Sequence, residues 1–165
     1  MADLIQNLNM AYEQNFYGSL PNKTDCKSFI QSVFQLYGIQ AAYNDSAGTI
    51  GTADELLDHL EGKSGSVSIW IKITGPKKMK TAFDYASKKY LVIVGAYSHD
   101  LNESHGHGHI AVLLPEMDSN YPKVYQGSAK SKVRGIKGLN YSFPKEMVHS
   151  DDSRIHFYRM PYPNL

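Results

Sequence analysis

The first half of the chain places apolar residues at helical spacing. Residues 3–17 and 26–37 each carry such an apolar stripe, and a glycine follows each stripe, which predicts two amphipathic helices. The segment Thr52-Ala53-Asp54-Glu55 has the Thr-x-x-Glu pattern of a capping box and predicts a short helix that ends at Gly62. Pro76 is expected to open a further helix over residues 76–90, because proline suits the first helical turn.

The second half of the chain carries mainly strand patterns. Alternating or continuous apolar runs predict strands over residues 67–74, 90–96, 108–114, 123–126 and 154–160, with a short strand expected at 139–143. Pro115 is expected to stop the strand that begins at residue 108. Helices followed by a meander of strands predict an α+β fold, a single domain over residues 1–165 with its N-terminal helices packed on an antiparallel β-sheet.

Composition narrows the class of protein. Of the 165 residues, 42% are hydrophobic and 20% are charged, as in an ordinary globular protein with one core. The net charge of +1 argues against a protein that coats nucleic acid. No window approaches the about 20 apolar residues that a membrane-spanning helix needs. The first residues lack the basic and apolar regions of a Sec-type signal, so we expect synthesis in the cytoplasm without a signal peptide.

Cys26, the only cysteine of the chain, stands at the start of the second predicted helix. Unpaired backbone N–H groups and the positive end of the helix dipole favour the thiolate at such a position, and the thiolate is the form that attacks carbonyl carbon. The alternative is a buried cysteine that acts as a small apolar side chain. Cys26 precedes the apolar stripe rather than belonging to it, which favours a catalytic role.

His109 is the candidate base for this nucleophile, because it opens the apolar run Ile110-Ala111-Val112-Leu113-Leu114, which would hold its ring in place. A helix-capping cysteine followed by a strand-borne histidine is typical of a papain-like cysteine hydrolase. Gln126, on the next predicted strand, could orient the imidazole through its amide oxygen, although it is equally well an ordinary glutamine at a strand end.

The histidines of Ser104-His105-Gly106-His107-Gly108-His109 suggest a second interpretation. They alternate, so in an extended chain they would share a face and could bind zinc or copper. The glycines between them are typical of a loop, and no cysteine lies nearby to complete a metal site. A non-enzymatic, His-rich metal-binding module is therefore the alternative to a hydrolase.

At this point the motifs resemble a known family. Asp25-Cys26-Lys27-Ser28-Phe29-Ile30 resembles the Asp-Cys-Ser-Gly-Phe/Leu-Val motif of NlpC-type cell-wall peptidases, and Gly108-His109-Ile110-Ala111-Val112 resembles their Gly-His-Val-Ala/Gly-Val/Ile motif. The match is closest to the first family of type VI secretion amidase effectors. Segments 21–33, 91–95, 127–128 and 135–139 follow the order of that family's motifs. Lys27-Ser28 replaces the usual Ser-Gly after the nucleophile.

The resemblance implies a papain-like fold with Cys26 as nucleophile, His109 as base and Gln126 at the third catalytic position, and it implies no metal or other cofactor. The implied substrate is the peptidoglycan stem peptide, cut at the amide between D-glutamate and meso-diaminopimelate. Its anionic carboxylates are expected to meet the basic residues Lys130, Lys132, Arg134 and Lys137.

The resemblance also implies partners and a site of action. The protein would be delivered by secretion machinery into the periplasm of rival bacteria, and a cognate immunity protein would neutralise it at home. No nucleic acid and no membrane insertion are expected. Within the hydrolases, a housekeeping or phage-derived cell-wall peptidase remains the alternative to an antibacterial effector.

Overall fold

The structure is a computed structural model that describes residues 2–14, 26–39, 52–63, 68–101, 107–127 and 135–162. Within them lie the helices α1 (Ala2–Gln14), α2 (Cys26–Leu36), α3 (Ala53–Leu60), α4 (Lys78–Ser87), α5 (Leu139–Ser142) and α6 (Lys145–His149), and the short 3₁₀ helix η1 (Ser98–Asp100). The strands are β1 (Ile71–Ile73), β2 (Tyr90–Ala96), β3 (His109–Asp118), β4 (Tyr121–Gln126), β5 (Gly135–Gly138) and β6 (His156–Pro161).

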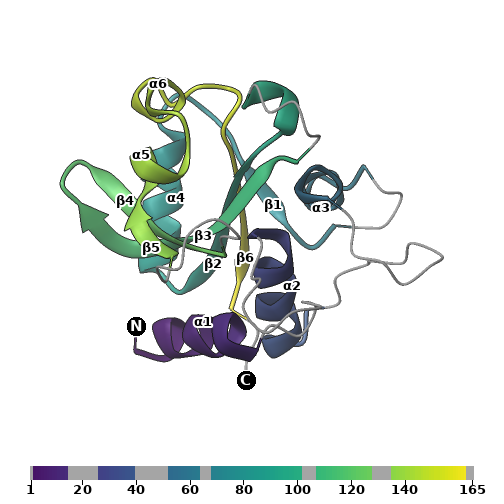
Figure 1. The fold of residues 1–165 in the computed structure, drawn as a ribbon. Coiled ribbons are helices and arrows are strands. Elements are labelled where there is room, and N and C mark those ends of the chain that lie inside the picture. Colours follow the sequence, from purple (N-terminus) through teal and green to yellow (C-terminus); the bar gives the residue numbers. More distant parts are fainter. Residues whose placement is uncertain are drawn as a thin grey trace.

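The described strands form one sheet in the order β1-β6-β2-β3-β4-β5, and all neighbours run antiparallel (Figure 1). The α+β class with an antiparallel sheet is therefore confirmed, in the arrangement expected of a papain-like fold. In the described part of the chain, no helix has the length and apolar character needed to cross a membrane.

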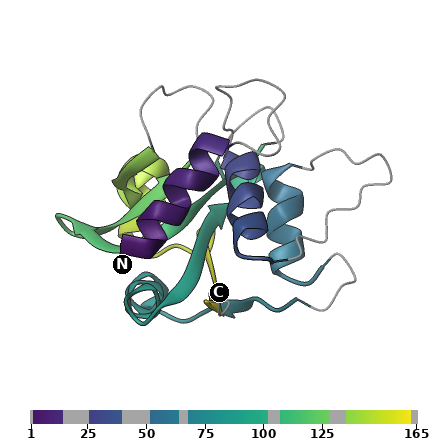
Figure 2. The same cartoon turned by 90° about the horizontal axis from the view of Figure 1, so that it is seen from below.

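Helices cover both faces of the sheet. Figure 2 shows α1, α2 and α3 on one side and α4 end-on at the other. Along β2, Leu91 and Ile93 pack into the core shared with α1 to α3, whereas Val92 and Val94 pack into a second core shared with α4, α5 and α6. A strand covered on both faces needs apolar residues at every position, which is why the 90–96 run is continuous.

The packing of α2 fixes the position of its first residue. Its apolar stripe is almost completely buried against β3 and β4, and the ring of Phe29 stacks on that of Tyr125 with 5.1 Å between centroids. The helix ends as predicted, because Gly38 takes a left-handed conformation with φ of 63° and lets the chain leave. With its axis and its end fixed in this way, the start of α2 is held against the sheet.

The capping box that predicted α3 is present. The Thr52 hydroxyl accepts from the Glu55 N–H at 3.3 Å, and the Glu55 carboxylate accepts from the Thr52 N–H at 2.8 Å. Both bonds satisfy N–H groups that have no partner within the helix. The predicted start of α3 is thus confirmed.

Several predicted boundaries are wrong. Of the strand expected at 67–74, only Ile71–Ile73 form β1 among the described residues 68–74, and Ile69 and Ile71 are exposed; residue 67 lies outside the described part of the chain. The helix expected over 76–90 is α4, which ends at Ser87, because Tyr90 already belongs to β2. α1 agrees with its prediction as far as Gln14, and residues 15–17 lie outside the described part of the chain.

Pro115 does not stop β3, which continues to Asp118. The β3–β4 register shifts between Leu113 and Met117, and a proline is accepted at such an irregularity because no regular ladder bond is required of it. The strand expected at 139–143 is wrong, because Leu139–Ser142 form α5 and Phe143 follows it; α6 was not predicted.

Candidate functional site

Cys26 is the first residue of α2 and is partly exposed, at the edge of the core formed with α1 to α3. Its Sγ lies 3.9 Å from the carbonyl oxygen of Gly108. Gly108 directly precedes His109, so the sulfur lies next to the peptide unit that joins these two residues. Cys26 and Gly108 are 82 residues apart in sequence, so the start of α2 meets the residue that precedes β3 at this point.

His109 is the first residue of β3, and its Nε2 lies 2.6 Å from the Oε1 of Gln126. An amide oxygen can only accept, so this contact assigns the ring proton to Nε2 and leaves Nδ1 as the basic nitrogen. The ring also lies against Phe143, with 5.0 Å between ring centroids. The imidazole is therefore held in one orientation and one tautomer.

Gln126 is the last residue of β4 and is only 4% exposed. The register that pairs Val112 with Tyr125 brings the end of β4 to the start of β3. Gly135 of β5 faces Gln126, and a Cβ on this glycine would lie 1.9 Å from the Gln126 carbonyl oxygen. The absence of a side chain at Gly135 lets β5 pair closely with the strand that carries Gln126.

The other predicted site residues are only partly within the described residues. Lys137 is a half-buried residue of β5, two positions after the glycine that faces Gln126. Lys130, Lys132 and Arg134 lie outside the described part of the chain, so their proposed contact with substrate stays a prediction.

The metal-binding alternative also stays a prediction. His107 is exposed and His105 lies outside the described residues. Within the six described ranges, no three His, Cys, Asp or Glu side chains come together as a metal site.

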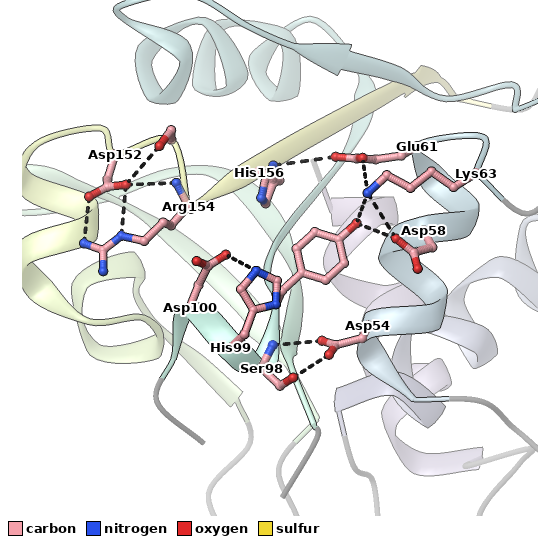
Figure 3. Close-up of polar contacts among 12 residues, drawn as sticks. Asp54, Asp58, Glu61, Lys63, Ser98, His99, Asp100, Asp152, Arg154 and His156 are labelled. Carbon is pink, nitrogen blue, oxygen red and sulfur yellow. Dashed lines mark hydrogen bonds and ion pairs between the residues drawn. The ribbon is translucent and has the colours of Figure 1, made fainter. Parts of the chain in front are cut away.

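The sequence did not single out Asp54, a residue of the first turn of α3 that lies beside this site. Its Oδ1 accepts from the backbone N–H of Ser98 at 2.9 Å, and its Oδ2 accepts from the Ser98 hydroxyl at 2.5 Å (Figure 3). A Cβ on Gly108 would lie 2.2 Å from Asp54 Oδ1. The sequence alone identifies Asp54 only as an acidic residue in the first turn of a helix, where negative charge is favourable.

An open pocket of about 550 Å³ extends from Asp54 along α3 toward the start of β6. Its lining is polar: Asp54, Asp58, Glu61, Lys63, Lys72, Tyr97, His99, Asp100, Ser153 and His156. Burial alone would raise the pKa of Glu61, but hydrogen bonds from Lys63, Lys72 and Tyr158 outweigh it and lower the pKa to about 2. This carboxylate is therefore ionised at neutral pH.

At His156, which lines the same pocket, burial outweighs the attraction of the nearby opposite charge. Burial, with the nearby Lys72 charge, lowers the pKa of His156 to about 4, although the Glu61 carboxylate would raise it. The imidazole is neutral at pH 7, and its Nδ1 lies 3.7 Å from Glu61 Oε1 (Figure 3).

Comparison with known proteins shows a likeness to a curated enzyme. No protein-family model matches the chain. The chain is 25% identical over 150 residues to the peptidoglycan amidase Tse1 of Pseudomonas aeruginosa, an alignment that covers 90% of this chain and 82% of that protein. The likeness supports the resemblance to amidase effectors that the order of motifs indicated.

Proposed function

We propose that this protein is a peptidoglycan amidase that cleaves the stem-peptide amide between D-glutamate and meso-diaminopimelate by cysteine catalysis. The observation that carries the proposal is the approach of the Cys26 sulfur to the peptide unit that precedes His109. The bond between His109 and Gln126 and the likeness to a peptidoglycan amidase over 90% of the chain support it.

In the first half-reaction, His109 Nδ1 takes the thiol proton and Cys26 Sγ attacks the carbonyl carbon of the amide. The N-terminal turn of α2 favours the thiolate. In the proposed mechanism, the backbone N–H of Cys26 donates to the developing oxyanion. Loss of one such donor typically costs about 2.7–4 kcal/mol of barrier. The C–N bond then breaks, His109 gives its proton to the leaving amine, and a thioester remains on Cys26.

In the second half-reaction, water hydrolyses the thioester. Neutral His109 accepts a proton from the attacking water, and the Cys26 thiolate leaves when the second tetrahedral intermediate collapses. Gln126 takes part through His109, because its Oε1 accepts from Nε2–H in both protonation states of the ring. Besides the amide substrate, the reaction consumes one molecule of water and needs no other co-reactant.

Purified sacculi or muropeptides test the chemistry. Wild type should release stem-peptide fragments, whereas Cys26→Ala and His109→Ala should not. His149→Ala is the matched histidine control, because His149 is exposed on α6 and takes no part in the proposed site. Equal product release by wild type and Cys26→Ala would end the proposal, and mass spectrometry of the fragments identifies the bond that is cut.

We further propose that the enzyme acts as an antibacterial effector, delivered by secretion machinery into the periplasm of target cells and neutralised by an immunity protein at home. Toxicity that requires both periplasmic targeting in a Gram-negative host and an intact Cys26 would support this role. Co-expression of a small protein encoded next to the gene should then restore growth. Equal toxicity of wild type and Cys26→Ala would refute it.

The four basic residues after β4 are proposed to bind the carboxylates of the stem peptide. Lys137 is the one among the described residues, and Lys137→Met should raise KM and leave kcat nearly unchanged. An unchanged KM would remove Lys137 from the binding site.

A further inference from the structure

Asp54 joins two segments that flank the connection between β2 and β3. Ser98, in the turn that follows β2, donates to Asp54 through both its backbone N–H and its hydroxyl. Gly108, the residue before β3, packs so closely that a Cβ would lie 2.2 Å from Asp54 Oδ1 and 2.6 Å from the Ala96 carbonyl oxygen. One carboxylate from α3 therefore holds the exit of β2 and fits against the entry of β3.

The entry of β3 is also where the proposed catalytic groups meet. The Gly108 carbonyl contacts the Cys26 sulfur, and the next residue is His109. A shift of Gly108 would move its carbonyl relative to the sulfur and would rotate the start of the strand that carries the imidazole. A misplacement of about 1 Å in a reacting pair can lower the rate by about 10²-fold.

We propose that Asp54 is a positioning residue of this enzyme, which sets the Cys26–His109 pair by fixing Gly108 and Ser98. The inference rests on the proposed function, because it assigns a role within that reaction. Aspartate suits the position for two reasons. Its two oxygens each accept one bond from Ser98, and its Oδ1 lies so close to Gly108 that only a residue without a Cβ fits there.

Substitutions at this pair separate positioning from simple electrostatics. Asp54→Asn keeps the shape of the side chain but loses one of the two acceptors, and it removes a negative charge from the neighbourhood of the sulfur. Loss of the charge alone would favour the thiolate and would speed alkylation of Cys26. Loss of positioning would slow it, because the imidazole would no longer take the thiol proton. The two explanations thus predict opposite signs.

The experiment measures the iodoacetamide alkylation rate at pH 6 beside the steady-state hydrolysis of muropeptides. Cys26 is the only cysteine, so alkylation reports this sulfur alone. An ordinary thiol with a pKa of about 8.5 is less than about 1% thiolate at this pH. Asp58→Asn is the matched control, because this substitution also removes one negative charge from α3. Asp58 lies one helical turn further along the helix and accepts hydrogen bonds from Tyr97 and Lys63.

We expect Asp54→Asn and Ser98→Ala each to lower the alkylation rate and kcat by about tenfold. Asp54→Ala should lower both by about 10²-fold, and KM should stay within twofold of wild type in all three variants. Ser98→Ala should have little further effect in the Asp54→Ala background, because both changes break the same contact. Asp58→Asn should alkylate and turn over like wild type. Thermal unfolding of each variant shows that it is folded, and Asp54→Asn serves if Asp54→Ala does not fold.

Faster alkylation of Asp54→Asn, or rates for it that match those of Asp58→Asn, would overturn the inference. Failure of the proposed function looks different: wild type and Cys26→Ala would then release product equally. The alkylation rates would still decide, in that case, whether Asp54 positions Cys26.

Discussion

The half-buried His156, which is neutral at pH 7, leads to a prediction about stability in acid. Its side chain is only 15% exposed and lies between the rings of Tyr97 and Tyr158. Because burial and the Lys72 charge lower its pKa to about 4, the folded protein keeps this ring neutral at pH values where the unfolded chain, with an ordinary value of 6.5, already binds a proton. Protons therefore bind preferentially to the unfolded state between about pH 6.5 and 4, and stability falls as the pH is lowered through that window.

The expected loss of stability follows from the two pKa values of His156, one in the unfolded chain and one in the folded protein. At 1.36 kcal/mol per pH unit, the difference between 6.5 and about 4 corresponds to about 3 kcal/mol over the whole window. Between pH 7 and pH 5 the expected loss from His156 is about 2 kcal/mol. His59, whose pKa is also lowered by burial, adds a loss of the same sign. Glu61 contributes only at lower pH, since its depressed value near 2 affects stability below its ordinary value of 4.5.

Urea unfolding at pH 7 and pH 5 isolates the contribution of His156. The variant His156→Gln cannot take the proton, so its free energy of unfolding should fall about 2 kcal/mol less between these pH values than that of wild type. Any pH-independent cost of the substitution cancels in this difference. The exposed His149→Gln serves as the control and should keep the wild-type loss. Equal losses for wild type and His156→Gln would refute the reasoning.

Three further predictions concern single contacts. Gln126→Ala removes the acceptor for His109 and should lower kcat by about 10²-fold with KM unchanged; a rate within twofold of wild type would count against an orienting role. Phe29→Ala empties a fully buried ring position and should cost about 3–5 kcal/mol in urea unfolding, and a cost below about 1 kcal/mol would contradict the packing. Tyr158→Phe removes the hydroxyl that donates to Glu61 and should cost about 1 kcal/mol, measured in the same way, whereas greater stability than wild type would show that the bond is unfavourable.

Sequence reasoning succeeded where the signal is local. Four consecutive residues, the capping box, predict the start of α3. One glycine, whose positive φ other residues rarely adopt, predicts the end of α2. The continuous run of β2 was also readable, because burial on both faces leaves no polar position. Such features depend on a few neighbouring residues, so no knowledge of the tertiary structure is needed.

It failed where two periods fit the same residues. Leu139, Tyr141 and Phe143 alternate and suggested a strand, but the structure buries the first and third and leaves Tyr141 69% exposed. Positions four apart share a helix face, so a single helical turn satisfies the same apolar residues. In so short a segment only the packing partners decide between the two.

The residues of the site fall into the same two groups, those that the sequence predicts and those that it does not. Cys26 and His109 are predicted as candidates from their positions at the starts of a helix and a strand, and Gln126 from the expected order of the strands. Asp54 is not, because its partner Ser98 lies 44 residues away and its close contact with Gly108 exists only in the folded chain. A residue that acts through the backbone of another segment leaves no motif in its own surroundings.

The sheet ends in brief border strands, three residues in β1 and four in β5, within the part of the chain that the structure describes. Unpaired backbone groups at a sheet border are the usual template on which copies of a protein add to one another, and short borders offer few of them. Even at high protein concentration, copies of this chain would therefore find little described backbone at these two borders on which to add strand by strand.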